Sequence, residues 1–193
     1  EAFGAKHNLE TKVDEAGNVL IKKNATPGKE NLQTVVLQSH IDMVCEKNND
    51  VQHDFLTDPI ETEIDGEWLK AKGTTLGADN GIGVATELAI LADDSIEHGP
   101  LECLFTVDEE TGLTGAFALQ EGFMSGDILL NLDSEDEGEI FIGCAGGIDT
   151  VIRLPYRKMV LPAHKFAVQV KVKGLQGGHS GDDINKGRGN AIK

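Results

Sequence analysis

The sequence has few basic residues. Its 17 lysines and arginines stand against 33 aspartates and glutamates, which gives a formal net charge of −16. No basic cluster is interleaved with aromatic residues, the pattern with which proteins follow a phosphate backbone. We therefore expect no nucleic-acid partner. The carboxylate excess indicates either a solvated surface or sites that hold cations.

Cysteine is also scarce, with only Cys45, Cys103 and Cys144, far apart in the chain. This spacing excludes a CxxC metal clip and indicates no disulfide framework. Because their neighbours are apolar or small, we expect all three to be small buried side chains.

Long apolar runs are absent, so the sequence predicts no membrane span and no membrane partner. Residues 1–8 lack the basic-then-apolar pattern of a secretory signal. We therefore expect a cytoplasmic protein. A start without methionine and an end just after a glycine-rich segment are typical of a fragment.

Short apolar strands alternate with helical patterns over most of the chain, which predicts an α/β fold. Residues 165–173 instead alternate polar and apolar side chains, as in a strand with one wet face. One such strand cannot bury a core. We predict an α/β domain over residues 1–147 and the beginning of an α+β domain over 148–193, both incomplete. The expected strands are 12–13, 18–22, 34–38, 61–64, 68–72, 101–107, 127–132 and 139–144, and the expected helices are 82–92 and 113–120.

Metal-binding side chains follow three of the apolar strands, and one more lies at the entrance of the 82–92 helix. In open α/β sheets, such side chains gather in a crevice at the carboxyl ends of the strands. Imidazole and carboxylate suit Zn, Mn or Co, so we expect two divalent cations, with zinc the default. The residues are His40, Asp42, Asp79, Glu109, Glu110 and Asp133.

The spacing of these residues predicts different roles. Asp42 lies two positions after His40, so it can accept the free ring N–H of that histidine. Glu109 and Glu110 are adjacent and should point in different directions, so that one binds metal and the other takes a proton from water. The alternatives are an exposed loop histidine and a pair of solvated acids at a helix N-terminus.

Other motifs are incomplete. The segment from Asp133 superficially resembles a calcium loop, but its twelfth position is Cys144 instead of glutamate. Gly81 and Gly83 form only part of a dinucleotide fingerprint, and no GxxxxGK[ST] segment occurs. His179 lies in a glycine-rich turn, where a histidine by itself indicates no more than a polar loop tip.

Taken together, these motifs resemble the two-zinc peptidases and deacylases that include glutamate-releasing carboxypeptidases and aminoacylases. The likeness is greatest to the cytosolic aminoacyl-histidine dipeptidases, also called carnosinase-like or beta-alanyl-histidine dipeptidases. The resemblance implies a mixed-sheet zinc-peptidase catalytic domain followed by a lid and dimerisation domain. The segments that carry it are LQSHIDMVCEKNND, HDFLTDPI, DGEWLKAKGTTLGADNGIG, VDEETGLTGAFALQ, NLDSEDEGEIFIGCAGGID and KGLQGGHSG, which cover nearly the whole chain.

The resemblance implies that Asp79 bridges two metals, that His40 and Asp133 complete one site, and that Glu110 binds the other. The second site of this family needs one more histidine after the lid, which neither His164 nor His179 matches by position. The chain by itself is therefore expected to bind the second metal poorly and could be inactive alone.

The resemblance also assigns the remaining residues. Glu109 is the general base, Asp42 supports His40, and the peptide bond between Asp79 and the next residue is cis. His179, from the lid and in relatives sometimes from the opposite subunit, steadies the oxyanion. The expected activity is hydrolysis of dipeptides, with aminoacyl-histidine substrates favoured. The rivals are a deacylase on the same site and a non-catalytic metal-binding or dimerisation module.

Overall fold

The structure is a computed structural model that describes residues 1–134, 136, 138–144, 146, 148, 150–160, 162–177, 183 and 185–189. The chain divides into two compact units, residues 1–137 and 138–193. The domain boundary predicted between 147 and 148 lies further along the chain and stays a prediction. All helices and strands of the described residues belong to the first unit.

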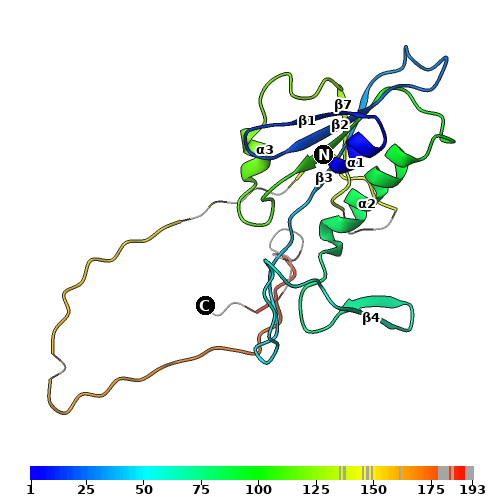
Figure 1. The fold of residues 1–193 in the computed structure, drawn as a ribbon. Helices are drawn as coiled ribbons and strands as arrows, with labels where there is room; N and C mark the ends of the chain where they lie inside the picture. Colours follow the sequence, from blue (N-terminus) through cyan, green and yellow to red (C-terminus); the bar gives the residue numbers. More distant parts are fainter. Residues whose placement is uncertain are drawn as a thin grey trace. The chain divides into compact units, whose positions relative to one another are not determined.

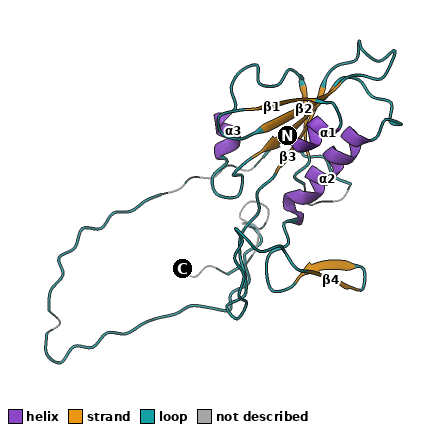
Figure 2. Ribbon diagram, in the orientation of Figure 1, coloured by secondary structure: helices purple, strands orange, loops and turns teal. Residues whose placement is uncertain are grey.

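The first unit is built on a five-stranded sheet with the order β1-β2-β6-β3-β7 (Figures 1 and 2). β1 pairs with β2 and β2 with β6 in antiparallel fashion, whereas β3 lies parallel to both β6 and β7. The mixed sheet confirms the predicted fold class. Its strands are β1 (Glu10–Val13), β2 (Val19–Lys23), β3 (Val35–His40), β6 (Leu101–Thr106) and β7 (Ile128–Asn131).

The central strands are buried on both faces. Successive residues of a strand point to opposite faces, and the apolar runs of β2, β3 and β6 therefore supply two core layers. One layer packs with residues of α1 (Ala2–Lys6) and α2 (Ala78–Ala92), and the other with the segment that follows α3 (Thr114–Ala118). The first layer contains Ile21, Leu37, Leu91, Cys103 and Phe105, and the second contains Leu20, Val36 and Leu104.

The helix α2 covers the sheet and carries Asp79 in its first turn. It is preceded by Gly77, whose φ of 75° is a left-handed conformation that glycine adopts without strain. Asp79 and Asn80 have non-helical backbone angles, so the regular helix begins after them, close to the predicted start. At the other end, Lys23 Nζ donates to the carbonyls of Ile90 and Asp93 at 3.1 and 2.7 Å. This ammonium satisfies carbonyls that the last turn leaves free.

A separate two-stranded hairpin, β4 (Thr62–Asp65) and β5 (Trp68–Ala71), turns at the predicted Asp-Gly pair. Gly66 has a φ of 64°, which explains the choice of glycine there.

Two predicted strands are wrong. Residues 139–144 and 165–173 are described and contain no strand. Their apolar side chains are exposed, among them Ile142 and Phe166. Alternation shows which residues would share a face, but a strand also needs a partner for its backbone, and the described residues provide none.

The cysteine prediction holds only for Cys103, which is buried between β2 and β3 in the sheet. Cys45 and Cys144 are exposed, because their loops contribute nothing to the two core layers. All three thiols are free.

Among the described helices, none has both the length and the apolar character needed to cross a membrane.

Candidate metal centre

The predicted residues meet at the carboxyl edge of the parallel strands. β3 ends at His40, β6 is followed after two residues by the acidic pair, and β7 is followed after one residue by Asp133. The register places His40 beside Thr106 of β6, so these strand ends lie at the same level. The helix α2 supplies the remaining ligand candidate, Asp79. The peptide bond from Asp79 to Asn80 is cis, as the resemblance implied.

His40 lies at the centre of the site and is 1% exposed. Its Nε2 lies 3.0 Å from Asp79 Oδ1 and 3.9 Å from Asp133 Oδ2. Its Nδ1 lies 3.0 Å from the main-chain carbonyl of Asp42, which can accept the ring proton. Nδ1–H therefore leaves Nε2 as the nitrogen that faces the carboxylates, the arrangement expected of a metal-binding imidazole.

The carboxylate of Asp42 does something that the sequence did not indicate. It lies 3.4 Å from His40 Nδ1, further away than the main-chain carbonyl of the same residue. Its two oxygens instead accept the backbone N–H groups of Glu109 and Glu110, at 3.0 and 3.1 Å. Asp42 thus ties the end of β3 to the loop that carries both acids. Burial raises the pKa of Asp42, but the backbone hydrogen bonds, above all those from Glu109 and Glu110, and the charge of His40 together lower it below its ordinary value.

The loop after β6 is shaped by Asp108, which has a φ of 57°. Its carboxylate accepts hydrogen bonds from the hydroxyls of Thr111 and Thr114. A turn this tight presents the next two residues side by side to Asp42. Sequence reasoning missed Asp108, although aspartate is a common turn residue whose side chain forms local hydrogen bonds.

The acids of the site crowd one another. Burial, a hydrogen bond to Asp79 and the charge of Asp79 raise the pKa of Asp133 to about 6. Burial and the charges of Asp79 and Glu109 also raise the pKa of Glu110. Burial lowers the pKa of His40, but the hydrogen bond to Asp79 and the surrounding carboxylates raise it by more, so the net shift is upward.

The donor set fits a divalent cation. Two groups each bring three possible ligand atoms within 4.8 Å of one another: His40 with Asp79 and Asp133, and His40 with Glu109 and Glu110. Imidazole nitrogen and carboxylate oxygen are zinc ligands, and a cation placed among them would relieve the repulsion between the acids.

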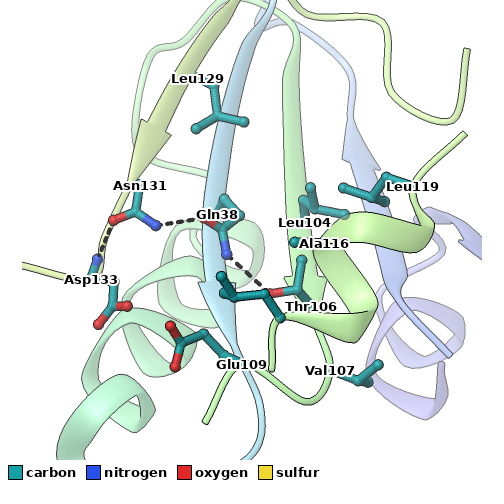
Figure 3. A pocket seen from close by; sticks show the side chains of 11 residues that line it. Gln38, Leu104, Thr106, Val107, Glu109, Ala116, Leu119, Leu129, Asn131 and Asp133 are labelled. Atoms are coloured by element: carbon teal, nitrogen blue, oxygen red, sulfur yellow. Dashed lines mark hydrogen bonds between the residues drawn. The ribbon is translucent and has the colours of Figure 1, made fainter. Parts of the chain in front are cut away.

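A pocket of about 220 Å³ opens beside Glu109 and Asp133 (Figure 3). Most of its lining is apolar, and the polar side chains of β3, β6 and β7 that reach it are Gln38, Thr106 and Asn131.

Six of the seven predicted site residues are therefore brought together. The seventh, His179, lies outside the described residues.

Comparison with known proteins gives matches over most of the chain. Residues 36–179 match the peptidase family M20/M25/M40. The cytosol non-specific dipeptidase of Escherichia coli is 57% identical over 180 residues, which are 93% of this chain and 37% of that protein.

Solved structures also match this chain. The aminoacylhistidine dipeptidase from Vibrio alginolyticus matches with a TM-score of 0.75 and 52% identity, over 98% of this chain and 39% of that one. The aminopeptidase PepT from Bacillus cereus matches with a TM-score of 0.58 and 26% identity, over 70% of this chain and 36% of that one. The chain thus spans well under half the length of the relatives that it matches.

Proposed function

Because the chain belongs to the peptidase family M20/M25/M40, we propose that it forms the catalytic part of a metal-dependent dipeptidase. The favoured substrates are dipeptides with a C-terminal histidine, the class after which the Vibrio alginolyticus enzyme is named. The observation that carries the proposal is the convergence of His40, Asp79 and Asp133 with the acid pair held by Asp42. A group of solvated surface acids would not share one buried imidazole.

In this proposal His40, Asp79, Asp133 and Glu110 would hold two divalent cations, most simply zinc. When bound, the cations polarise the scissile carbonyl and lower the pKa of water from about 15.7 toward about 7. Glu109 remains free of the metals and takes the proton of the attacking water. It then delivers that proton to the leaving amine, so that the peptide bond breaks without a free amide anion.

Asp42 supports this division of labour. Its two oxygens hold the backbone of Glu109 and Glu110 at nearly equal distances, so the base and its neighbour are fixed relative to β3. Its main-chain carbonyl orients His40. We propose that residues 148–193 form the beginning of a lid domain that also serves dimerisation, and that His179 in this domain steadies the oxyanion.

The proposal is tested by a panel of dipeptides and N-acyl amino acids, assayed on the intact protein with and without a chelator. We expect aminoacyl-histidine dipeptides to be hydrolysed, and the activity to disappear with chelator and return with Zn²⁺. Turnover of N-acyl amino acids alone would favour the deacylase. An absence of metal-dependent turnover on every member of the panel would sink the proposal.

Glu109→Gln separates a catalyst from a metal-binding module. Glutamine keeps the shape but cannot accept the proton, so we expect kcat to fall by about 10²- to 10⁴-fold while bound metal is retained. Metal content by atomic absorption and kcat on one dipeptide give the two readouts. The matched control is Glu67→Gln, at an exposed position in the turn of the β4–β5 hairpin, which should behave as the unsubstituted protein. Equal activity of the two variants would exclude Glu109 as the base.

The E. coli relative is named a cytosol dipeptidase, and we propose the same compartment for this protein.

A further inference from the structure

A line of hydrogen bonds crosses the three parallel strands beside the proposed metal centre (Figure 3). The backbone N–H of Asp133 donates to Asn131 Oδ1 at 3.0 Å, and Asn131 Nδ2 donates to Gln38 Oε1 at 2.6 Å. Gln38 Nε2 then donates to Thr106 Oγ1 at 3.1 Å. The hydroxyl of Thr106 completes the line by donating to the main-chain carbonyl of Ser39 at 3.4 Å. The line thus runs from Asp133, one proposed metal ligand, to Ser39, the residue that precedes the proposed ligand His40.

The direction of every bond in this line is fixed by its two ends. A backbone N–H can only donate, so Asn131 must turn its oxygen toward Asp133 and its amino group toward Gln38. Gln38 must therefore turn its own amino group toward Thr106. A main-chain carbonyl can only accept, so the hydroxyl proton of Thr106 goes to Ser39. The two amides have one consistent orientation, which is otherwise ambiguous for such side chains.

The position of Asp133 depends on this line because β7 ends two residues earlier. Within the described part of the chain, two hydrogen bonds fix the backbone between the end of β7 and Asp133. Leu132 N–H donates to the Gln38 carbonyl at 2.8 Å, and Asp133 N–H donates to the Asn131 side chain. The carboxylate of Asp133 lies 3.9 Å from His40 Nε2 and is 30% exposed. The surrounding core therefore does not fix it, and rotation of its backbone would move it out of ligand range.

We infer that Asn131 is a positioning residue for the metal centre: it holds Asp133 in ligand geometry, and Gln38 and Thr106 hold Asn131 in turn. This inference rests on the proposed function, since it assumes that Asp133 binds a cation. It assigns no chemical step to Asn131, which acts only through its neighbour.

The direct test is Asn131→Leu in the intact protein, titrated with Co²⁺. Asn131 is exposed on an edge strand, and leucine has nearly the same branched shape as asparagine, so the fold should be retained. We expect Co²⁺ affinity to fall about 10- to 100-fold, the usual cost of removing a side chain that orients a ligand. The visible absorption bands of bound Co²⁺ should also shift, because they report coordination geometry. Asn49→Leu, at an exposed loop position, is the control and should leave both unchanged.

A second pair of variants guards against misfolding. Thr106→Val keeps the shape of the side chain but removes its hydroxyl, whereas Thr106→Ser keeps the hydroxyl. Thr106 is 3% exposed and has no proposed contact with metal or substrate. We expect Thr106→Val to change the Co²⁺ spectrum in the same direction as Asn131→Leu, by a smaller amount. Thr106→Ser should give the spectrum of the unsubstituted protein.

The outcomes are distinguishable. If the unsubstituted protein binds Co²⁺ and hydrolyses dipeptides but Asn131→Leu keeps its affinity and spectrum, the positioning role is overturned and the proposed function stands. If Asn131→Leu unfolds, the comparison of valine and serine at Thr106 decides, and identical spectra there overturn the inference. If the unsubstituted protein neither binds Co²⁺ nor hydrolyses any dipeptide, the proposed function fails and the inference fails with it.

Discussion

At the scale of single residues, the main chain and the side chain of Asp42 support the proposed metal centre in different ways. Its main chain holds His40, while its side chain holds the loop of Glu109 and Glu110. Asp42→Asn leaves the main-chain contact but turns an amino group toward a backbone N–H, which breaks one of the two loop bonds. We expect kcat to fall about 10- to 100-fold on a dipeptide substrate, with Zn²⁺ still bound through His40.

Steady-state kinetics and metal content check this prediction, with Asp50→Asn in an exposed loop as the matched control. If Asp42→Asn instead loses its metal and keeps kcat in excess Zn²⁺, the carboxylate acts through His40, as the sequence had indicated.

Residue types and spacing were sufficient to predict which side chains meet, because parallel strands end at one edge whatever their exact register. They were not sufficient to predict what Asp42 contacts, since its partners are backbone N–H groups 67 and 68 positions away. Asn131 and Gln38 left a usable signal, as each is the first polar residue after an apolar run and lies two positions before Asp133 or His40. Side chains two apart share a face, so such residues lie beneath the ligand.

At the scale of elements, the contact of α2 with the sheet contains a buried acid. Glu87 is fully buried in the helix, and within the described part of the chain neither carboxylate oxygen has a partner in full hydrogen-bond geometry. Burial raises the pKa of Glu87 to about 7, and the nearby Ser39 hydroxyl and Cys103 thiol oppose this only in part. The apolar periodicity of the sequence predicted where the helix lies. It could not predict that Glu87 is buried, because a glutamate at this position would be exposed if the helix were less covered.

Glu87 should make the stability of the fold depend on pH. The pKa of Glu87 is higher in the folded state than in the unfolded state. The protonated carboxyl group therefore contributes fully to the stability of the fold below about pH 4.5, and this contribution is lost as the pH rises through about 7. Glu87→Gln removes the charge and should therefore stabilise the protein at pH 8, by on the order of 3 kcal/mol, with little effect at pH 4.5. Urea unfolding at the two pH values measures the difference.

Glu121→Gln, at an exposed position, is the control for a general effect of removing one negative charge. Equal stability changes at both pH values in Glu87→Gln would show that folding does not raise the pKa of this carboxyl group.

At the scale of the whole molecule, the predicted mixed sheet is confirmed, and two strands predicted within residues 138–193, at 139–144 and 165–173, are wrong. The core strands of the first unit find partners within the chain, so their apolar character alone locates them. The alternating segment 165–173 depends on a partner that alternation cannot specify, and its apolar side chains, such as Val168 and Val170, are exposed.

The net charge of −16 gives a last prediction, because part of it is concentrated in the metal centre. Zn²⁺ bound only to the folded state should stabilise it by about 2.7 kcal/mol at a free concentration 100 times Kd. For a protein of this size the Tm should rise by roughly 5 to 10 °C and fall again with chelator.

A cation can also stabilise an acidic protein by general screening, which Asp79→Asn distinguishes from binding. This variant should lose the Zn²⁺ effect while Asp50→Asn, with the same change of charge, keeps it. Equal responses of the two variants in a thermal scan would mean that Zn²⁺ acts on the overall charge and that the carboxylates beside His40 do not form its site.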